Sequence, residues 1–314
     1  MKKHWLPIIV FFVLAVALVA VATGCGETTT TTATPESTTT AAGDTTTTAA
    51  EQTTTTAAEE EVGATGPNAE AADAAIAAVT KSDKIETPKT LVPGKLQAGS
   101  DTAFPPFEYS DGKGGYIGFD VDILTSLCKK MGLELVMVST AWDGIIPALV
   151  SDRFDIIGSA MSITDERKEQ INFSDAYYQN DLAITTPVDK PIENADGLVG
   201  KIVGVQVDTT GQFAVEKIEG IKEMKKYENI ILAIQDLEAG RTEAVVNDEP
   251  SNAYQIRNKP NLANTGKIVV DDDYGFGIKK ENTELLEAIN AALGEIKADG
   301  TYDLIRAKWF GKAQ

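Results

Sequence analysis

Four short segments of the sequence combine charged, hydroxyl and aromatic side chains, the groups that hold small charged molecules. They are residues 101–109, 142–147, 159–167 and 247–250. Each segment follows a predicted strand. In α/β sheets, ligands bind beyond the carboxyl ends of the strands. The sequence therefore places its candidate site where these four segments meet.

The scarcity of histidine and cysteine excludes several kinds of chemistry. The single histidine is His4, and the two cysteines are Cys25 and Cys128. His4 and Cys25 lie in the N-terminal targeting segment, and Cys128 fits a buried helix face. The folded part therefore has no internal disulfide, Cys/His zinc site, Ser-His-Asp triad or Cys-His dyad. We expect no metal and no cofactor, whereas chemistry that needs only carboxylates stays open.

Neither the glycine pattern nor the net charge indicates binding of nucleotides or nucleic acid. Gly112, Gly114, Gly115 and Gly118 lack the strand-to-helix context of a dinucleotide loop and predict a hairpin turn instead. The formal net charge is −19, which repels a phosphate backbone. We therefore expect no nucleic acid partner.

The N-terminus has the layout of a secretory signal. A basic start is followed by an almost wholly apolar run and then by small residues before Cys25. Residues 1–24 resemble a bacterial lipoprotein signal peptide, which implies cleavage before Cys25 and lipidation of its sulfur; a retained membrane anchor is the alternative. The next part, residues 25–66, is rich in threonine, with 18 in residues 26–66. It has no apolar periodicity, so we expect a disordered tether.

Beyond an alanine-rich lead-in at 67–94, strands and helices alternate twice. We expect strands at 95–100, 133–138, 155–159, 201–206 and 243–247, and helices at 119–131, 142–151, 211–218, 230–240 and 284–297. Such alternation predicts α/β lobes with mainly parallel sheets. Because the pattern runs twice, we expect two lobes. The first consists of 95–180 and 273–314, and the second of 181–272.

Seven stretches together resemble the polar amino acid binding proteins of ABC importers, also called solute-binding protein family 3. In chain order they are DTAFPPFEY, GFDVD, GIIPAL, SITDER, INFSDAYY, VVND and ADGTYDLIRAKWFG. The resemblance implies a two-lobed, type II periplasmic-binding-protein fold with the ligand cleft between the lobes. It also implies a monomeric, non-enzymatic binding protein outside the cytoplasm that serves an importer permease, with hinges near 178–183 and 271–275.

The resemblance assigns the two charged ends of an amino acid to opposite lobes. Arg167 matches the arginine that grips the α-carboxylate, and a guanidinium fork suits a planar carboxylate. Thr210 matches the residue whose backbone N–H joins that grip at a helix start. Asp248 matches the carboxylate for the α-ammonium, with Ser162 and the carbonyl of Ala160 as further acceptors.

The same resemblance assigns the ligand side chain. Phe104 and Trp142 match two aromatic residues that sandwich it, and Asp101 matches the acid at its far end. An aromatic sandwich that ends in a carboxylate suits a guanidinium, an ammonium or a carboxamide. Met161, Gln206 and Thr209 complete the expected site.

The sequence leaves open alternatives for both the ligand and the activity of the protein. Gln206 and Asn247 stand where glutamine-selective relatives carry lysine and histidine, and Asp101, with Glu108 nearby, favours arginine or lysine. Glutamine is the alternative ligand. A cyclohexadienyl dehydratase-like enzyme, with Glu249 as general acid, is the alternative activity, and a sensor domain acting through a partner is another. Asp208 replaces a common family glycine, and aspartate tolerates left-handed backbone better than most residues.

Overall fold

The computed structural model describes residue 65 and residues 67–311. The predicted signal peptide, Cys25 and almost all of the predicted tether therefore lie outside the described residues. Within the described part of the chain, no helix is both long enough and apolar enough to cross a membrane.

The first lobe contains a five-stranded sheet in the order β5-β1-β6-β13-β7. The strands are β1 (Lys95–Ser100), β5 (Glu134–Ser139), β6 (Ile156–Ile157), β7 (Asn172–Phe173) and β13 (Gly277–Ile278). β1 pairs in parallel with β5 and β6, whereas β13 runs antiparallel to β6 and β7. One reversed strand therefore enters a sheet that is otherwise parallel.

Helices from both ends of the chain cover the first sheet. They are α2 (Phe119–Met131), η1 (Trp142–Gly144), α3 (Ile145–Val150), α4 (Asp165–Lys168), α8 (Thr283–Ala298) and α9 (Thr301–Phe310). α2 packs against β5, α8 and α9, and α3 packs against β1 and β6. Buried side chains from the sheet and helices, including Leu96, Leu124, Ile289 and Trp309, form the main core cluster. The last helices pack on the lobe to which strands β1, β5, β6 and β7 belong.

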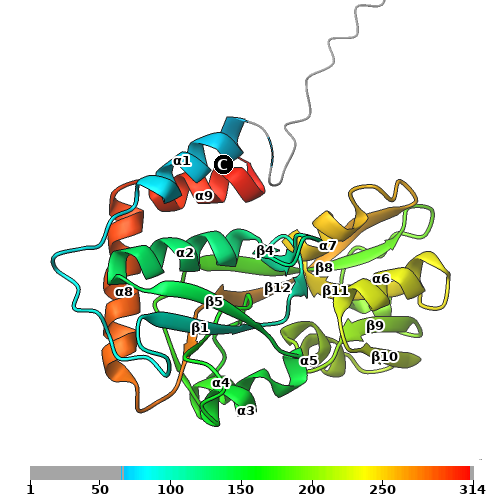
Figure 1. Ribbon diagram of the computed structural model, residues 1–314. Helices are drawn as coiled ribbons and strands as arrows, with labels where there is room; N and C mark the ends of the chain where they lie inside the picture. The colour runs from blue at the N-terminus through cyan, green and yellow to red at the C-terminus, as the bar shows by residue number, and fades with distance from the viewer. Residues whose placement is uncertain (1–64, 66, 312–314) are drawn as a thin grey trace, which may run out of the picture. The chain divides into compact units, whose positions relative to one another are not determined.

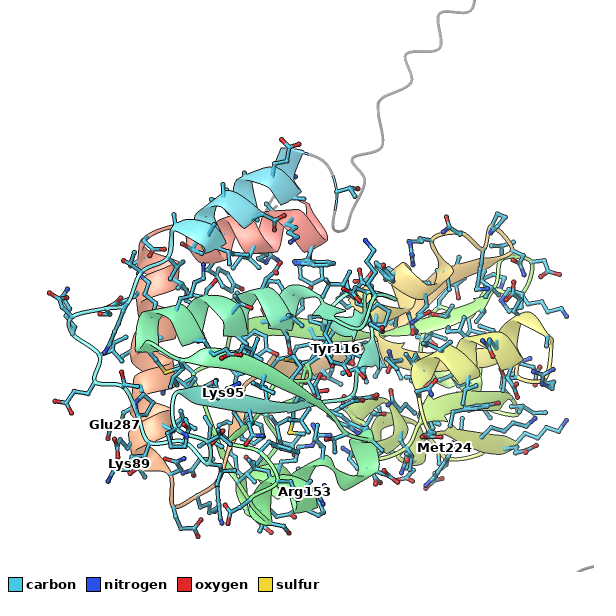
Figure 2. The ribbon with its side chains drawn as sticks, in the orientation of Figure 1. Lys89, Lys95, Tyr116, Arg153, Met224 and Glu287 are labelled. Atoms are coloured by element: carbon cyan, nitrogen blue, oxygen red, sulfur yellow. The ribbon has the colours of Figure 1, made fainter. Side chains whose placement is uncertain are left out.

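The second lobe repeats this plan with the order β10-β9-β11-β8-β12. Its strands are β8 (Tyr178–Pro187), β9 (Ile202–Gln206), β10 (Glu223–Tyr227), β11 (Ala244–Asp248) and β12 (Leu262–Tyr274). Its helices are η2 (Ala195–Leu198), α5 (Thr210–Glu216), α6 (Ile230–Glu238) and α7 (Glu249–Ile256). β8 is the reversed strand in this sheet, so both sheets are mainly parallel, as predicted. Figure 1 shows β1 and β5 on one side and β9 and β10 on the other, and Figure 2 labels Lys95 in the first sheet and Met224 in the second.

Two antiparallel strands connect the lobes. Near the crossing, Tyr178 of β8 pairs with Tyr274 of β12, and Asn180 pairs with Asp272. An isolated bridge then joins Tyr274 to Ser162 of the first lobe. The predicted hinge segments 178–183 and 271–275 lie in these strands, and their hinge role stays a prediction.

A small antiparallel sheet stands beside α2. It consists of β2 (Ala103–Phe104), β3 (Glu108–Ser110) and β4 (Tyr116–Ile117). Between β3 and β4, the Asp111 carboxylate accepts hydrogen bonds from the Lys113 and Gly115 amides. The predicted hairpin turn is therefore confirmed.

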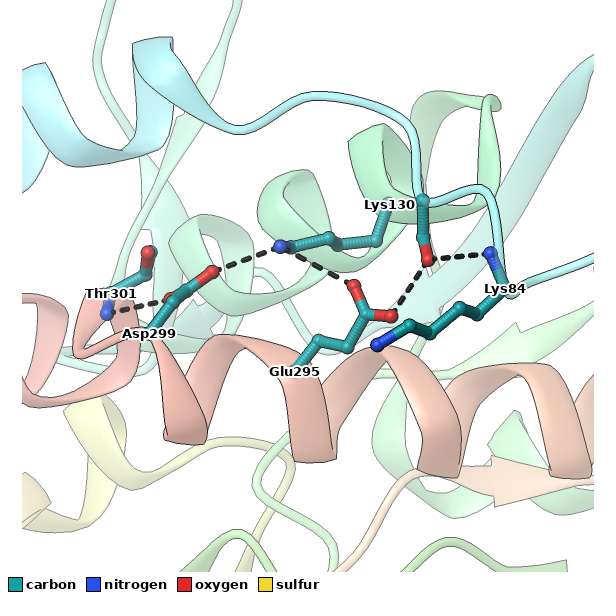
Figure 3. A network of polar contacts seen from close by, with 6 residues as sticks. Lys84, Lys130, Glu295, Asp299 and Thr301 are labelled. Carbon is teal, nitrogen blue, oxygen red and sulfur yellow. Dashed lines mark hydrogen bonds and ion pairs between the residues drawn. The ribbon is translucent and has the colours of Figure 1, made fainter.

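The lead-in is bound to the first lobe rather than separate from it. Helix α1 (Pro67–Ala78) lies against α9, and its Ala72 and Ile76 are buried (Figure 1). Further along, the Ser82 hydroxyl donates to Glu295 over 2.7 Å, and Lys130 pairs with Glu295 and Asp299 (Figure 3). These contacts make residues 67–84 part of the packed body.

A charged cluster joins α1 to α2 and α9. Lys308 Nζ lies 2.7 Å from Asp73 Oδ1 and 2.9 Å from Asp122 Oδ2. The indole N–H of Trp309 also donates to Asp122 over 2.7 Å. The Asp122 side chain is 17% exposed, whereas that of Asp73 is 60% exposed. Asp122 therefore depends on the charge of Lys308 more than Asp73 does.

We predict that Lys308→Met costs much more stability than Asp73→Asn. Methionine keeps the apolar stem but leaves the Asp122 carboxylate without its cation, at a cost of about 3 kcal/mol. Asp73→Asn removes an exposed charge and should cost about 0.5 kcal/mol. Urea unfolding followed by circular dichroism measures both. Equal losses would contradict the assigned asymmetry.

Candidate functional site

A small cavity lies between the two lobes. Its first-lobe lining is Asp101, Phe104, Trp142, Ser159, Ala160, Ser162 and Arg167, and its second-lobe lining is Gln206, Thr209, Thr210 and Asp248. Both lobes therefore supply charged and hydroxyl groups to the same cavity.

Arg167 is a buried cation at the start of the short helix α4. The Thr164 hydroxyl caps this helix by accepting the Arg167 amide, which fixes the backbone that carries the guanidinium. The guanidinium donates to the carbonyls of Ser162 and Asp208 over 2.9 and 3.0 Å. It also lies 5.1 Å from the ring centroid of Trp142. Burial lowers the pKa of Arg167, and nearby carboxylates oppose this shift.

The loop before α5 brings backbone groups of the second lobe to this arginine. Asp208 has a φ of 56°, a left-handed conformation that glycine usually adopts, as anticipated for this position. Its carbonyl accepts from Arg167 and also from the Trp142 indole N–H over 3.0 Å. The Thr209 hydroxyl caps α5 by accepting the Gln212 amide. The loop therefore aims one carbonyl and the start of α5 at the cavity.

The opposite charge comes from a carboxylate pair. Asp248 ends β11, and Asp272 lies on the crossing strand β12. The Asn180 amide donates to Asp248 Oδ1 over 2.6 Å and lies 3.5 Å from Asp272 Oδ2. Burial, and then the charge of Asp272, raise the pKa of Asp248 to about 8, and burial also raises the pKa of Asp272.

A third carboxylate occupies another part of the lining. Asp101 Oδ2 accepts a 2.9 Å hydrogen bond from Gln206 Nε2, which links the two lobes. Burial raises the pKa of Asp101, the Gln206 bond opposes this, and the charges of Glu228 and Asp143 add to the increase. Together with Phe104 and Trp142, Asp101 gives the lining an aromatic and acidic part.

Buried acids behind the lining support its backbone. The Ser159 hydroxyl donates to Glu108 over 2.7 Å and accepts the Asp101 amide over 2.9 Å. Asp120 accepts the Ala160 amide over 2.8 Å, and burial raises the pKa of Asp120 to about 7. Glu108 therefore reaches Asp101 through Ser159 rather than through the cavity.

The structure brings ten of the eleven sequence-predicted site residues to the cavity. The exception is Met161, which is buried in a core cluster with Ile145, Leu149 and Ile171. Ala160 has a φ of 43°, so the segment turns at this point and is not a regular strand. Ala160 and Ser162 line the cavity, whereas Met161 packs behind it.

Sequence reasoning missed Ser159, Asn180 and Asp272 as parts of the site. Asp272 belongs to an acidic run that the sequence analysis treated only as a hinge, and the concentration of charge where the chain crosses between lobes was the available signal. The Asp208 carbonyl gave no signal, because a backbone acceptor does not depend on residue type.

Other chemistries find less support in the described residues. No group of three or more His, Cys, Asp or Glu side chains there is arranged to hold a metal ion. Glu249 is exposed and does not line the cavity. The predicted general acid is thus outside the space where a ligand would be enclosed.

A two-lobed α/β body with a polar cavity between its lobes is typical of proteins that close around a ligand. Residues 96–312 match the bacterial extracellular solute-binding proteins, family 3, and the chain belongs to this family. The predicted family is thereby confirmed.

Three comparisons describe the similarity in more detail. The lysine/arginine/ornithine-binding periplasmic protein of Escherichia coli is 36% identical over 231 residues, which cover 70% of this chain and 88% of that protein. An ancestral arginine-binding protein bound to arginine is 39% identical with a TM-score of 0.67, covering 69% of this chain and 99% of that one. The ancestral arginine-binding protein bound to glutamine is 39% identical with a TM-score of 0.68, covering 70% and 100%.

We predict that Asp248→Asn stabilises the ligand-free protein as pH rises. Because the folded pKa of Asp248 is raised, the folded state binds more protons than the unfolded state between about pH 4 and pH 8. The native free energy of unfolding therefore falls through that window, whereas the neutral asparagine of the variant does not contribute to this loss. The variant should gain about 2 kcal/mol near pH 8 and little near pH 4.

Thermal unfolding at several pH values measures this difference. Asp189→Asn is the matched control, because that aspartate is exposed. A stability difference between Asp248→Asn and the native protein that does not change with pH would contradict the prediction.

Proposed function

We propose that this protein binds a basic amino acid, with arginine first, and delivers it to an ABC importer outside the cytoplasm. One observation carries the proposal: the Arg167 guanidinium and the Asp248 carboxylate line the same cavity from opposite lobes. The two charged ends of an amino acid need both groups, and neither lobe supplies both of them. The ligand therefore binds the closed arrangement more tightly and shifts the population toward it.

The ligand backbone has a matching group at each end. The α-carboxylate takes the guanidinium N–H groups of Arg167 and the amide of Thr210 at the start of α5. The α-ammonium donates to Asp248, the Ser162 hydroxyl and the Ala160 carbonyl. Three acceptors for three N–H donors leave no buried donor unpaired.

The charge at Asp101 favours a basic side chain. This carboxylate lines the cavity close to Phe104 and Trp142, and the charges of Asp143 and Glu228 add to its field. Among the described residues that line the cavity, Arg167 is the one cation, and it serves the ligand α-carboxylate. A guanidinium or ammonium between the rings gains cation–π and Coulomb energy that a neutral carboxamide does not.

Glutamine is the second candidate ligand. Gln206 already donates an amide N–H to Asp101, which shows that a carboxamide can bond this acid. One similar structure is an ancestral arginine-binding protein bound to arginine and another is an ancestral arginine-binding protein bound to glutamine, which supports considering both ligands for this chain. The enzyme alternative is less favoured, because Glu249 lies outside the cavity lining.

The location follows from the relatives and the N-terminus. The similar lysine/arginine/ornithine-binding protein is periplasmic. The small residues before Cys25 resemble the end of a lipoprotein signal peptide, so we include a lipid anchor on Cys25 in the proposal. The predicted tether would then let the folded body move near its membrane. Importer permease subunits are the proposed protein partners, and the carrier acts as a monomer without a cofactor.

We predict that Asp101→Asn weakens arginine binding at least tenfold, about 1.4 kcal/mol, and weakens glutamine binding much less. Asparagine keeps the shape of the side chain and removes the charge that a guanidinium needs. Calorimetry with L-Arg, L-Lys, L-Gln, L-His and L-Glu measures the ranking. Native affinity for arginine tenfold below that for glutamine would overturn the basic-first proposal.

We predict that Arg167→Ala abolishes binding of every amino acid, because the α-carboxylate is common to all of them. Arg153→Ala is the matched control, since Arg153 is an exposed arginine of the same lobe. Tryptophan fluorescence or calorimetry reports the loss. Retained affinity in Arg167→Ala would show that the α-carboxylate binds elsewhere.

A further inference from the structure

Asp272 is a buried carboxylate that connects the lobes just behind the cavity. It accepts a hydrogen bond from the Thr210 hydroxyl of the second lobe over 3.1 Å, and the Ser162 hydroxyl of the first lobe also donates to it. Asn180 adds a weaker contact at 3.5 Å. Donors from both lobes therefore reach Asp272, which favours its ionised form, while its buried Oδ1 has no hydrogen-bond partner among the described residues.

Asp248 has fewer donors and lies beside this anion. It is 6% exposed, and Asn180 donates to one of its oxygens. Its other neighbours include the Tyr274 hydroxyl and the charge of Arg167. Because Asp272 is held ionised by its donors, the cost of adding a second buried negative charge falls on Asp248.

The charges around the pair do not balance. Two buried carboxylates face one guanidinium, and that guanidinium is hydrogen-bonded to the carbonyls of Ser162 and Asp208 rather than to either acid. Among the described residues, Tyr178, Glu108 and Tyr274 also interact electrostatically with Asp248. Asp272 lines a second pocket together with the titratable residues Glu166, Glu216 and Lys217. One excess buried negative charge is best offset by a proton.

We propose that Asp248 and Asp272 hold one proton between them in the ligand-free protein, and that the α-ammonium of the incoming amino acid expels this proton to the solvent. The proposal rests on the proposed function and deepens it. It assigns Asp272 as a positioning residue that never needs to touch the ligand. Its charge adds to the effect of burial in keeping Asp248 protonated until a cation arrives.

The exchange follows from hydrogen-bond chemistry. An ammonium brings three donors and no acceptor, so it requires an acceptor carboxylate rather than a carboxylic acid. At hydrogen-bond distance its charge acts on Asp248 more strongly than the ligand carboxylate does, since that carboxylate lies farther away at Arg167. The O–H bond of Asp248 breaks, the proton passes to a buffer base, and the ammonium takes its place. The raised pKa of Asp248, about 8, agrees with this order of events.

The sign of the pH dependence follows. Below about pH 8 the ligand-free pair holds the proton that binding must release, so affinity rises with pH. We expect about a tenfold gain in affinity for each pH unit between about pH 6 and pH 7.5, the limit for one released proton.

Calorimetry of the full chain with L-arginine, in buffers of different ionisation enthalpy, counts the protons released. The native protein should release close to one proton per ligand near pH 7. Asp272→Asn should release far less and show a flat affinity between about pH 6 and pH 7.5. Asp273→Asn is the matched control: it removes the same charge from the adjacent position on β12, where the side chain points to the other side of the strand, and should behave like the native protein.

Two further measurements separate the possible failures. Asp101→Asn should keep the proton release, which excludes Asp101 as its source. The native measurement stands by itself if circular dichroism shows that Asp272→Asn does not fold. Amino acid binding without proton release, or unchanged release in a folded Asp272→Asn, would overturn this inference. Failure of every amino acid to bind would instead overturn the proposed function.

Discussion

A buried guanidinium and a buried pair of acids lie close together in this molecule without forming a direct ion pair. The Arg167 guanidinium donates its hydrogen bonds to the carbonyls of Ser162 and Asp208, and the Asp248 carboxylate takes the amide of Asn180. The guanidinium and the Asp248 carboxyl group are therefore desolvated without being paired with each other. A protein keeps such groups only if a rigid frame holds them, and the rest of the fold supplies that frame. Under the proposed function, the unpaired charge is what the zwitterion satisfies.

The frame consists of helix caps and buried hydrogen bonds within the two lobes. Thr164 and Thr209 cap α4 and α5, which fixes the backbone that carries Arg167 and the start of the second-lobe helix. In the first lobe, buried Asp120 accepts the Ala160 amide, and the Ser159 hydroxyl, which donates to buried Glu108, accepts the Asp101 amide. These supports lie within single lobes, whereas the bonds of Asp208 to Arg167 and of Gln206 to Asp101 cross between the lobes. Under the proposed function, lobe closure brings two largely preorganised surfaces together and adds these crossing bonds.

The sequence predicted the fold better than the details of the site. Apolar periodicity gave helix α2 with its observed ends, since nine of its thirteen residues are buried. Strand β10 (EMKKY) was missed because lysines interrupt its apolar pattern at the sheet edge, and β12 was missed because asparagine, glycine and aspartate do the same. In the site, the family resemblance pointed to side chains that line the cavity, but their roles stay predictions. Met161 packs in a core cluster instead. The resemblance could not identify the Asp208 carbonyl, because a backbone acceptor does not depend on residue type.

Asp272 lies where segments of both lobes meet, so no local sequence motif identifies it. Its carboxylate takes donors from Ser162 in one lobe and Thr210 in the other, and it lies on a strand that crosses between them. A change in lobe separation must alter these donors, and therefore the charge that Asp248 experiences. Under the proposed function, protonation, ammonium binding and lobe closure are linked through this one residue. If an importer reads closure of the lobes, it reads at the same time whether a cation has satisfied this acidic pair.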